Sequence, residues 1–312
     1  MRPDDWQLTE DVDDFLARAG HFLRSRPALH TMPLTVTEKL RTRGAGAYGT
    51  GRADAYGTGG ADPYGTQVPV FGLLEQAGTV RAACYRLPSR GLSPTRLTHG
   101  QADALAARLA GLGHSLPSVS ADHGTATAFA GAWQRHTGAA PALGTRIRLY
   151  RLGTLTPPEP LPEGRGRAVG EEDHELRVRW CGEFVDTVGE VPAVGARSWA
   201  GSRFADRHFT FWETPDGAPV AMAAATSMVA GMVRIDPVYT PAHLRGRGYA
   251  GAVTAEVSRA ALAGGATDVV LFADPANATS NALYQRLGYV PVTEWSVYDF
   301  APAAAPEEPE TR

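Results

Sequence analysis

The chain of 312 residues has very little lysine and very little cysteine. Lys39 is its single lysine among 30 basic residues, whereas alanine, glycine, arginine and proline are abundant. A codon bias toward G and C explains these features together. Cys84 and Cys181 are the two cysteines and lie in different halves of the sequence, which argues against a disulfide framework and a zinc cluster. We therefore expect both thiols to be buried, and we expect no metal site.

The sequence also lacks long apolar runs and an excess of basic residues. No run approaches the ~20 apolar residues of a membrane span, and the acidic N-terminus has no apolar segment of the signal-peptide kind. The formal net charge of −3 and the pI of about 6.3 are not those of a nucleic-acid-binding protein. These observations predict a cytoplasmic protein without nucleic-acid or membrane partners.

The length and a hydrophobic fraction of 43% favour two domains, because one ordinary core does not grow so large. A proline-rich segment at 157–166 is the expected linker between domains at 1–156 and 167–300. A glycine-rich repeat at 44–66 contains Tyr48, Tyr56 and Tyr64 and is expected to form a flexible loop. The tail at 301–312 has little to bury and is expected to be disordered.

Hydrophobic periodicity predicts an α/β fold with a similar order of elements in each half. In the first half we expect helices at 11–29 and 35–43, a strand hairpin turning at 77–78, a helix at 98–113, an apolar segment at 116–122, a helix at 125–137 and a strand at 144–155. In the second half we expect helices at 171–188 and 194–205, a hairpin turning at 215–217, a strand at 232–239, a helix at 248–262, a strand at 267–274, a helix at 279–288 capped by Thr279 or Ser280, and a final pair of strands at 289–300. The two halves are therefore expected to have related structures.

The most informative segment is 238–262, VYTPAHLRGRGYAGAVTAEVSRAAL. It predicts a strand, a glycine-rich turn and then an alanine-rich helix. Gly246 and Gly248 allow the backbone to approach an anion closely, and the helix N-terminus supplies N–H groups and a positive dipole end. Arg245 adds a fixed cation, and the small Ala250 keeps the first turn clear. This pattern predicts a cradle for a pyrophosphate.

The segment resembles the acetyl-coenzyme A loop of the GNAT superfamily, the GCN5-related N-acetyltransferases. In that loop an arginine or glutamine is followed by glycine three residues later and by glycine or alanine two residues after that, places filled here by Arg245, Gly248 and Ala250. The segment 273–292, ADPANATSNALYQRLGYVPV, is similar to a second family motif, with Asn281 and Tyr284 at its asparagine and tyrosine positions. The resemblance covers residues 168–300 and is strongest from residue 233 onward.

The resemblance implies a mixed, mostly antiparallel sheet with a splayed central strand pair, between 232–239 and 269–272. It implies acetyl-coenzyme A (acetyl-CoA) as cofactor and direct attack by an amine, with Tyr284 as general acid. The implied cofactor-binding residues are Val238, Tyr239, Arg245, Gly246, Arg247, Gly248, Tyr249, Ala250, Asn277, Asn281 and Tyr284.

The general base is left open between Glu213 and Asp236, and Asp236 has a second interpretation as a residue that turns the backbone before Pro237. His243 lies in the loop, either near phosphate or in solvent. Trp199 and Trp212 are expected in the core or a cleft wall.

The first half lacks the loop motif and resembles the degenerate half of tandem GNAT proteins, so it is not expected to bind coenzyme A (CoA). Three functions stay open: an N-acetyltransferase acting on a small-molecule or protein amine, a non-catalytic CoA-binding sensor or scaffold, and a transferase for another acyl group or a hydroxyl acceptor. The absence of a Gly-Lys-Ser or Gly-Lys-Thr ending excludes a phosphate loop of the kinase type. The chain is expected to be a monomer or a homodimer.

Overall fold

A computed structural model of the chain describes residues 5–44, 68–87, 91–188, 204 and 206–301. The tyrosine repeat, most of the helical signal at 194–205 with Trp199, and the tail after Ala301 lie outside these residues. Within the described part, no helix is long and apolar enough to cross a membrane.

The N-terminal half follows the predicted order, with two further strands. Its elements are β1 (Trp6–Thr9), α1 (Val12–Arg24), α2 (Thr31–Arg43), β2 (Val70–Gln76), β3 (Thr79–Arg86), β4 (Leu92–Pro94), α3 (His99–Gly111), β5 (Ser118–Asp122), α4 (His123–Thr137) and β6 (Ala140–Leu152). Local signals explain several boundaries. The Asp11 side chain caps α1 by accepting from the N–H of Asp13 and Asp14, and Ala77 and Gly78 turn the β2–β3 hairpin with φ of 50° and 73°, as a two-residue hairpin turn requires.

The C-terminal half comprises β7 (Arg165–Ala168), α5 (His174–Thr187), β8 (Arg207–Glu213), β9 (Pro219–Thr226), β10 (Met232–Tyr239), α7 (Tyr249–Ala263), β11 (Asp268–Ala273), α8 (Ala278–Arg286) and β12 (Tyr289–Ala301), with short 3₁₀ turns at Glu171–Asp173 and Ala242–Leu244. Two sequence expectations are wrong here. The segment expected as a pair of strands is the single long strand β12, and α8 is capped by Asn277, whose side chain accepts from the N–H of Ser280, not by Thr279 or Ser280.

The expected mixed, mostly antiparallel α/β architecture is confirmed, but the two expected sheets form one. All described strands join a 12-stranded sheet in the order β1-β2-β3-β4-β5-β12-β6-β11-β10-β9-β8-β7. The neighbours pair antiparallel except for β4 with β5 and β10 with β11. These two parallel pairs occupy equivalent places in the two halves, which is the structural counterpart of their similar element order.

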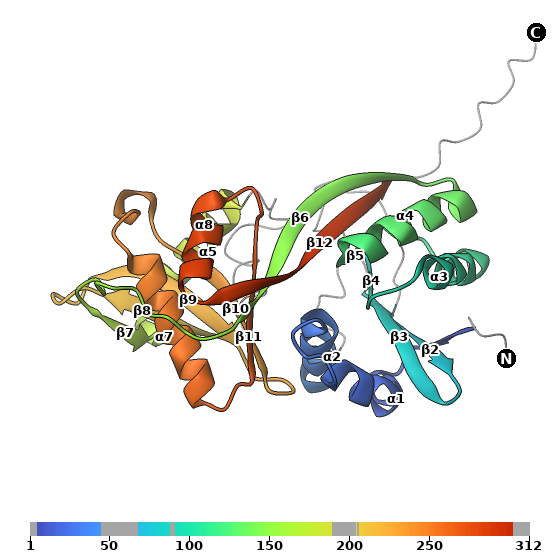
Figure 1. Cartoon of the computed structure of the whole chain (residues 1–312), viewed down its shortest axis with the longest axis horizontal. Helices are drawn as coiled ribbons and strands as arrows, with labels where there is room; N and C mark the ends of the chain where they lie inside the picture. Colours follow the sequence, from blue (N-terminus) through green and yellow to red (C-terminus); the bar gives the residue numbers. More distant parts are fainter. Residues whose placement is uncertain (1–4, 45–67, 88–90, 189–203, 205, 302–312) are drawn as a thin grey trace, which may run out of the picture.

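Two long strands connect the halves by exchanging places. β6, at the end of the N-terminal half, lies between β11 and β12, whereas β12, at the end of the chain, lies between β5 and β6. In Figure 1 the pair β6 and β12 runs diagonally from one half to the other. The sheet of each half therefore includes one strand from the other half of the sequence, and neither half forms a complete sheet by itself.

Helices cover both faces of the sheet. Helices α7 and α8 pack with β10, β11 and the end of β6 around one core, and α3 and α4 pack on the same face of the N-terminal half. On the other face, α5 covers β8 and β9, while α1 and α2 form a core that includes Leu149, Met232 and Val270. Because this last core contains residues of β6, β10 and β11, the N-terminal helices pack against the C-terminal half.

Candidate active site

The glycine-rich loop lies between β10 and α7, as its sequence predicted. Gly246 and Gly248 have φ of 78° and 82°, in the left-handed region that favours glycine, and Gly248 is the N-cap of α7. Among the described residues, none accepts a hydrogen bond from the backbone N–H groups of residues 246–251. A side chain at Gly246 would meet nothing within 4 Å. Six successive free donors at a helix N-terminus fit an anion such as a pyrophosphate.

Two arginines border these donors. The Arg245 Nε donates to the carbonyl of Thr240 at 3.1 Å, and an Nη2 of Arg247 donates to the carbonyl of His243 at 3.4 Å. Both arginines are exposed, so each keeps guanidinium donors for a ligand. His243 is itself exposed and contributes its backbone carbonyl to the loop.

The segment expected as a linker packs beside the same helix end. Pro162 lies 3.7 Å from the position that a Cβ of Gly248 would occupy, and Pro158 lies 3.2 Å from that of Gly251. Leu283 of α8 approaches Gly251 to 3.1 Å in the same way. The segment 157–166 thus forms one wall next to the first turn of α7.

The strands β10 and β11 separate at the position where the loop resemblance requires a gap. Their parallel pairing runs from Met232 and Asp268 to Ile235 and Leu271. Beyond it, β10 pairs only with β9 and β11 pairs only with β6. Val238 and Tyr239 are successive residues of β10, and successive strand residues direct their N–H and C=O groups to opposite sides. One of the two therefore presents its backbone groups to the gap.

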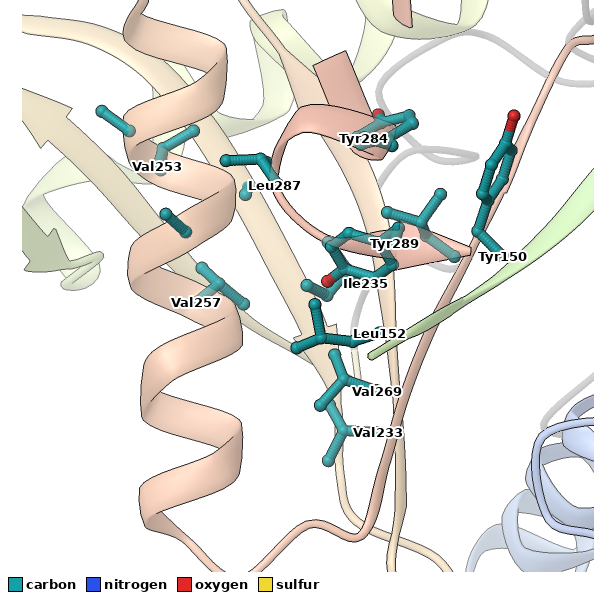
Figure 2. Packing of buried hydrophobic residues seen from close by; sticks show 14 of the residues in the cluster. Tyr150, Leu152, Val233, Ile235, Val253, Val257, Val269, Tyr284, Leu287 and Tyr289 are labelled. Atoms are coloured by element: carbon teal, nitrogen blue, oxygen red, sulfur yellow. The ribbon is translucent and has the colours of Figure 1, made fainter. Parts of the chain in front are cut away.

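Tyr284 lies buried on α8, with its ring close to those of two other tyrosines (Figure 2). Its ring centroid is 6.3 Å from that of Tyr150 and 6.1 Å from that of Tyr289. No described residue forms a hydrogen bond with its hydroxyl. Burial, and then the negative charge of Asp236, raise the pKa of Tyr284 above its usual value. The hydroxyl is thus protonated at neutral pH and free to interact with a ligand.

Asn281 joins the start of α8 to the end of β11. Its Nδ2 donates to the carbonyls of Asp274 and Asn277, each at 2.7 Å, and its Oδ1 accepts from the Tyr150 hydroxyl at 2.6 Å. Both of its N–H donors are used within the protein, as is the capping oxygen of Asn277. The two asparagines position α8, and their contact with a cofactor stays a prediction.

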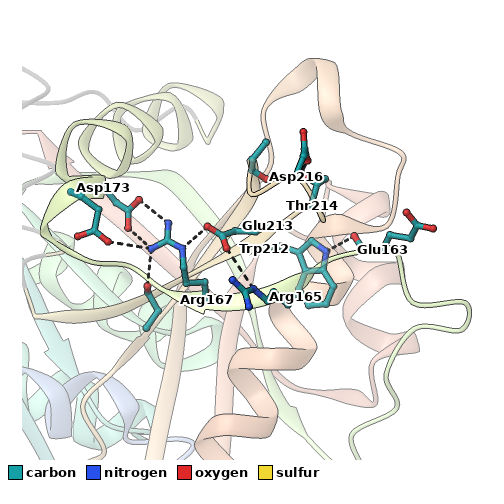
Figure 3. Close-up of polar contacts among 11 residues, drawn as sticks. Glu163, Arg165, Arg167, Asp173, Trp212, Glu213, Thr214 and Asp216 are labelled. Carbon is teal, nitrogen blue, oxygen red and sulfur yellow. Dashed lines mark hydrogen bonds and ion pairs between the residues drawn. The ribbon is translucent and has the colours of Figure 1, made fainter.

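The structure places the two candidate general bases, Glu213 and Asp236, in different surroundings. The Glu213 carboxylate is buried and accepts from the Nε of Arg167, and its second oxygen lies 3.8 Å from Arg165. Arg167 also holds Asp173 with two bonds of 2.7 and 2.8 Å (Figure 3). Glu213 therefore belongs to an ion-pair cluster at the β7–β8 edge of the sheet, which leaves little of its carboxylate for a substrate.

Asp236 lies where β10 leaves β11, near enough to Tyr284 to raise its pKa. Its carboxylate is 3.7 Å from Arg207, and its backbone carbonyl accepts from the Arg207 Nε at 3.2 Å. Its side chain is 26% exposed. Of the two acids, Asp236 is the one that the fold brings to the gap.

Comparisons with known proteins agree with this geometry. Residues 217–296, from β9 to the first half of β12, match the family model described as FR47-like protein. No curated protein sequence matches the chain. The chain superposes on a GCN5-related N-acetyltransferase from Sphaerobacter thermophilus with a TM-score of 0.55 and 18% identity, over 96% of each chain.

Two further structures match over nearly their full length. A tandem GNAT protein from the clavulanic acid biosynthesis pathway has a TM-score of 0.54 and 14% identity, over 97% of this chain and 100% of the other. A GNAT-family acetyltransferase from Colwellia psychrerythraea has a TM-score of 0.54 and 10% identity, over 95% and 99%. The chain has a tandem GNAT fold.

The N-terminal GNAT-like half has no counterpart of the cradle. The Thr98 side chain caps α3 by accepting from the N–H of Gln101, and the Gln101 side chain accepts from the N–H of Thr98. The N–H of Leu97 is bound by the Thr125 hydroxyl at 2.9 Å. The N–H groups of Leu97, Thr98 and Gln101 are therefore occupied by side-chain acceptors, unlike those of residues 246–251, which agrees with the missing loop motif.

Sequence reasoning missed two residues of the candidate site in the C-terminal half. Tyr150 reaches Asn281 and Tyr284 because β6 is inserted beside β11, and no local pattern signals such a distant pairing. Glu183 of α5 accepts from the Tyr239 hydroxyl at 2.6 Å; burial, and then this carboxylate, raise the pKa of Tyr239 to about 12. The expected wall residue Trp212 is buried, and its Nε1 donates to the carbonyl of Glu163 at 3.3 Å.

Proposed function

We propose that the chain is an acetyl-CoA-dependent N-acetyltransferase whose active site lies in the C-terminal half. The observation that supports this most is the row of six free N–H groups at 246–251, placed beside a separated strand pair and a protonated tyrosine. An anion cradle alone would fit many phosphorylated ligands. A strand-shaped gap next to it suits a ligand that is both phosphorylated and extended.

The backbone N–H groups and the exposed arginines would hold the pyrophosphate, and the free backbone groups of β10 would bind the extended arm. The bound cofactor supplies a thioester, so that a C–N bond forms to the amine as the C–S bond breaks. Tyr284 holds a proton at its hydroxyl, which suits it to protonate a leaving thiolate. Asp236 would take a proton from an ammonium group, since a carboxylate at the gap both attracts the cation and can accept its proton.

The test measures release of free thiol from acetyl-CoA by the full chain with a panel of primary amines: amino-acid esters, polyamines and short peptides with free N-termini. We expect at least one amine to accelerate thiol release, and Asp236→Asn to lower that rate by about 10²-fold or more. Arg259→Ala should leave the rate unchanged, because Arg259 is an exposed arginine at the far end of α7.

The alternatives give different results in the same experiment. Binding of acetyl-CoA without turnover of any amine would indicate the sensor or scaffold function. Faster thiol release from a longer acyl-CoA than from acetyl-CoA would indicate another acyl group. Absence of both binding and turnover would contradict the proposal.

A further inference from the structure

The N-terminal half contains a basic cavity at the position equivalent to the strand gap of the C-terminal half. The parallel strands β4 and β5 pair only at Leu92 and Val119 and then separate, as β10 and β11 do. A cavity of about 160 Å³ lies at this separation. Its walls come from the end of α1 and the connection to α2, from the ends of β4 and β5, and from Thr293 and Trp295 of β12. Because β12 belongs to the C-terminal half of the sequence, both halves build the cavity.

The charges around the cavity are strongly unequal. Arg26, Arg81 and Arg96 line it, whereas Asp122 is its single acidic lining residue. The nearest approach of Arg96 to Asp122 is 4.0 Å, and Asp122 is already used as the cap of α4. Neither Arg26 nor Arg81 forms an ion pair with a described residue. Three guanidinium groups with at most one counter-charge favour an anion, in a chain whose net charge is −3.

Aromatic rings that are held in place form part of the remaining walls. The ring of Phe22 packs against His30 with 4.9 Å between centroids. His30 is buried, and its Nδ1 lies 3.0 Å from the carbonyl of Leu23, so Nδ1 carries the proton and Nε2 is an acceptor. The indole of Trp295 is fixed by its bond to Ser120 at 2.8 Å. Fixed rings suit a planar ligand, because little side-chain entropy is lost on binding.

We propose that this cavity binds a small carboxylate with a flat apolar body, the carboxylate meeting the arginines and the body lying between Phe22 and Trp295. The cavity is smaller than the ~300–1,000 Å³ of ordinary ligand pockets, which excludes a whole coenzyme A and suits a molecule the size of benzoate. The N-terminal half, which has no anion cradle at α3, thus keeps a binding site for a smaller ligand. This site is separate from the proposed active site.

The test is calorimetric titration of the full chain with benzoate, with neutral benzamide and with inorganic phosphate. We expect one benzoate per chain and at least tenfold weaker binding of benzamide. The double variant Arg81→Gln/Arg96→Gln should bind benzoate about a hundredfold more weakly, since a bond to a charged group contributes about a tenfold change or more. Arg108→Gln, an exposed arginine of α3 outside the cavity, should bind benzoate as the unmodified chain does. Arg245→Ala should also leave this binding unchanged.

Three results would overturn the proposal: no saturable benzoate binding, equal binding of benzamide, or equal loss in the Arg108→Gln control. In the first case, binding of phosphate alone would show that the apolar body contributes nothing. Circular dichroism of each variant separates loss of the site from loss of the fold. A failure of acetyl-CoA binding would leave the proposal standing, because the two sites share no residue.

Discussion

Replacing Tyr284 by phenylalanine should separate catalysis from stability. The ring packs against two tyrosines, whereas the hydroxyl has no hydrogen-bond partner among the described residues. Tyr284→Phe keeps the packing and breaks no bond, so the free energy of unfolding should change by less than about 1 kcal/mol. Thiol release should fall by roughly 10²–10⁴-fold, the contribution of a positioned proton donor, while acetyl-CoA affinity should stay nearly constant.

Tyr150→Phe is the matched control, because it removes a hydroxyl from the neighbouring buried ring. The Tyr150 hydroxyl donates to Asn281 at 2.6 Å, and its loss leaves a buried amide oxygen without that donor. We expect about 1–3 kcal/mol of destabilisation and a smaller loss of turnover than for Tyr284→Phe. Urea unfolding and thiol release with the best amine of the panel measure both quantities. Wild-type turnover by Tyr284→Phe would refute its role as proton donor, and a destabilisation above about 2 kcal/mol would show that its hydroxyl has a partner.

Three further predictions concern pH, thiols and the loop. Burial raises the pKa of three tyrosines above 10.0, namely Tyr239, Tyr284 and Tyr289. As the pH rises, these tyrosines would ionise in the unfolded chain before they ionise in the folded chain. The free energy of unfolding should therefore not depend on them below pH 10, and above pH 10 it should fall by up to about 1.4 kcal/mol per group and pH unit. Urea unfolding between pH 8 and 11 that shows no decline would contradict this. Cys84 and Cys181 are buried, and burial raises the pKa of Cys84 to about 12, so a thiol reagent at pH 8 should label them only after unfolding; fast labelling of the native chain would show that they are accessible. Gly248→Val places a branched side chain at φ of 82° in the cradle and should lower the affinity for acetyl-CoA, measured by calorimetry, more than tenfold. Gly265→Ala, at φ of 92° past the other end of α7, should leave this affinity unchanged. Equal affinities of the two variants would argue against the cradle.

Local signals made much of the C-terminal half predictable. The strand at 232–239 has the predicted bounds, and the loop and α7 follow from glycines and an apolar periodicity that act within a few residues. Tyr284 was predicted as a site residue because its motif lies within one short helix, and its role stays a prediction. The cap of α8 was misplaced by two or three residues, since Asn277, Thr279 and Ser280 can all cap a helix and lie within four residues of one another.

The pairing of distant strands was not predictable in this way. β6 and β12 are more than a hundred residues apart, and nothing in either strand indicates that each completes the other half's sheet. The position of Tyr150 beside Tyr284 depends on that exchange, as does the part of Trp295 in the N-terminal cavity. Similarly, Glu213 stands in the sequence as a carboxylate at the end of a strand, and its ion pair with Arg167 depends on the pairing of β7 with β8.

The most direct test of the account is calorimetric titration of the full chain with acetyl-CoA, compared with Arg245→Ala and with Arg259→Ala as control. The account predicts one site per chain, weakened about tenfold by the first substitution, which removes a charge-assisted contact, and unchanged by the second. No binding, or binding that both substitutions leave unchanged, would mean that the donors of the loop do not hold the cofactor and would contradict the proposed activity.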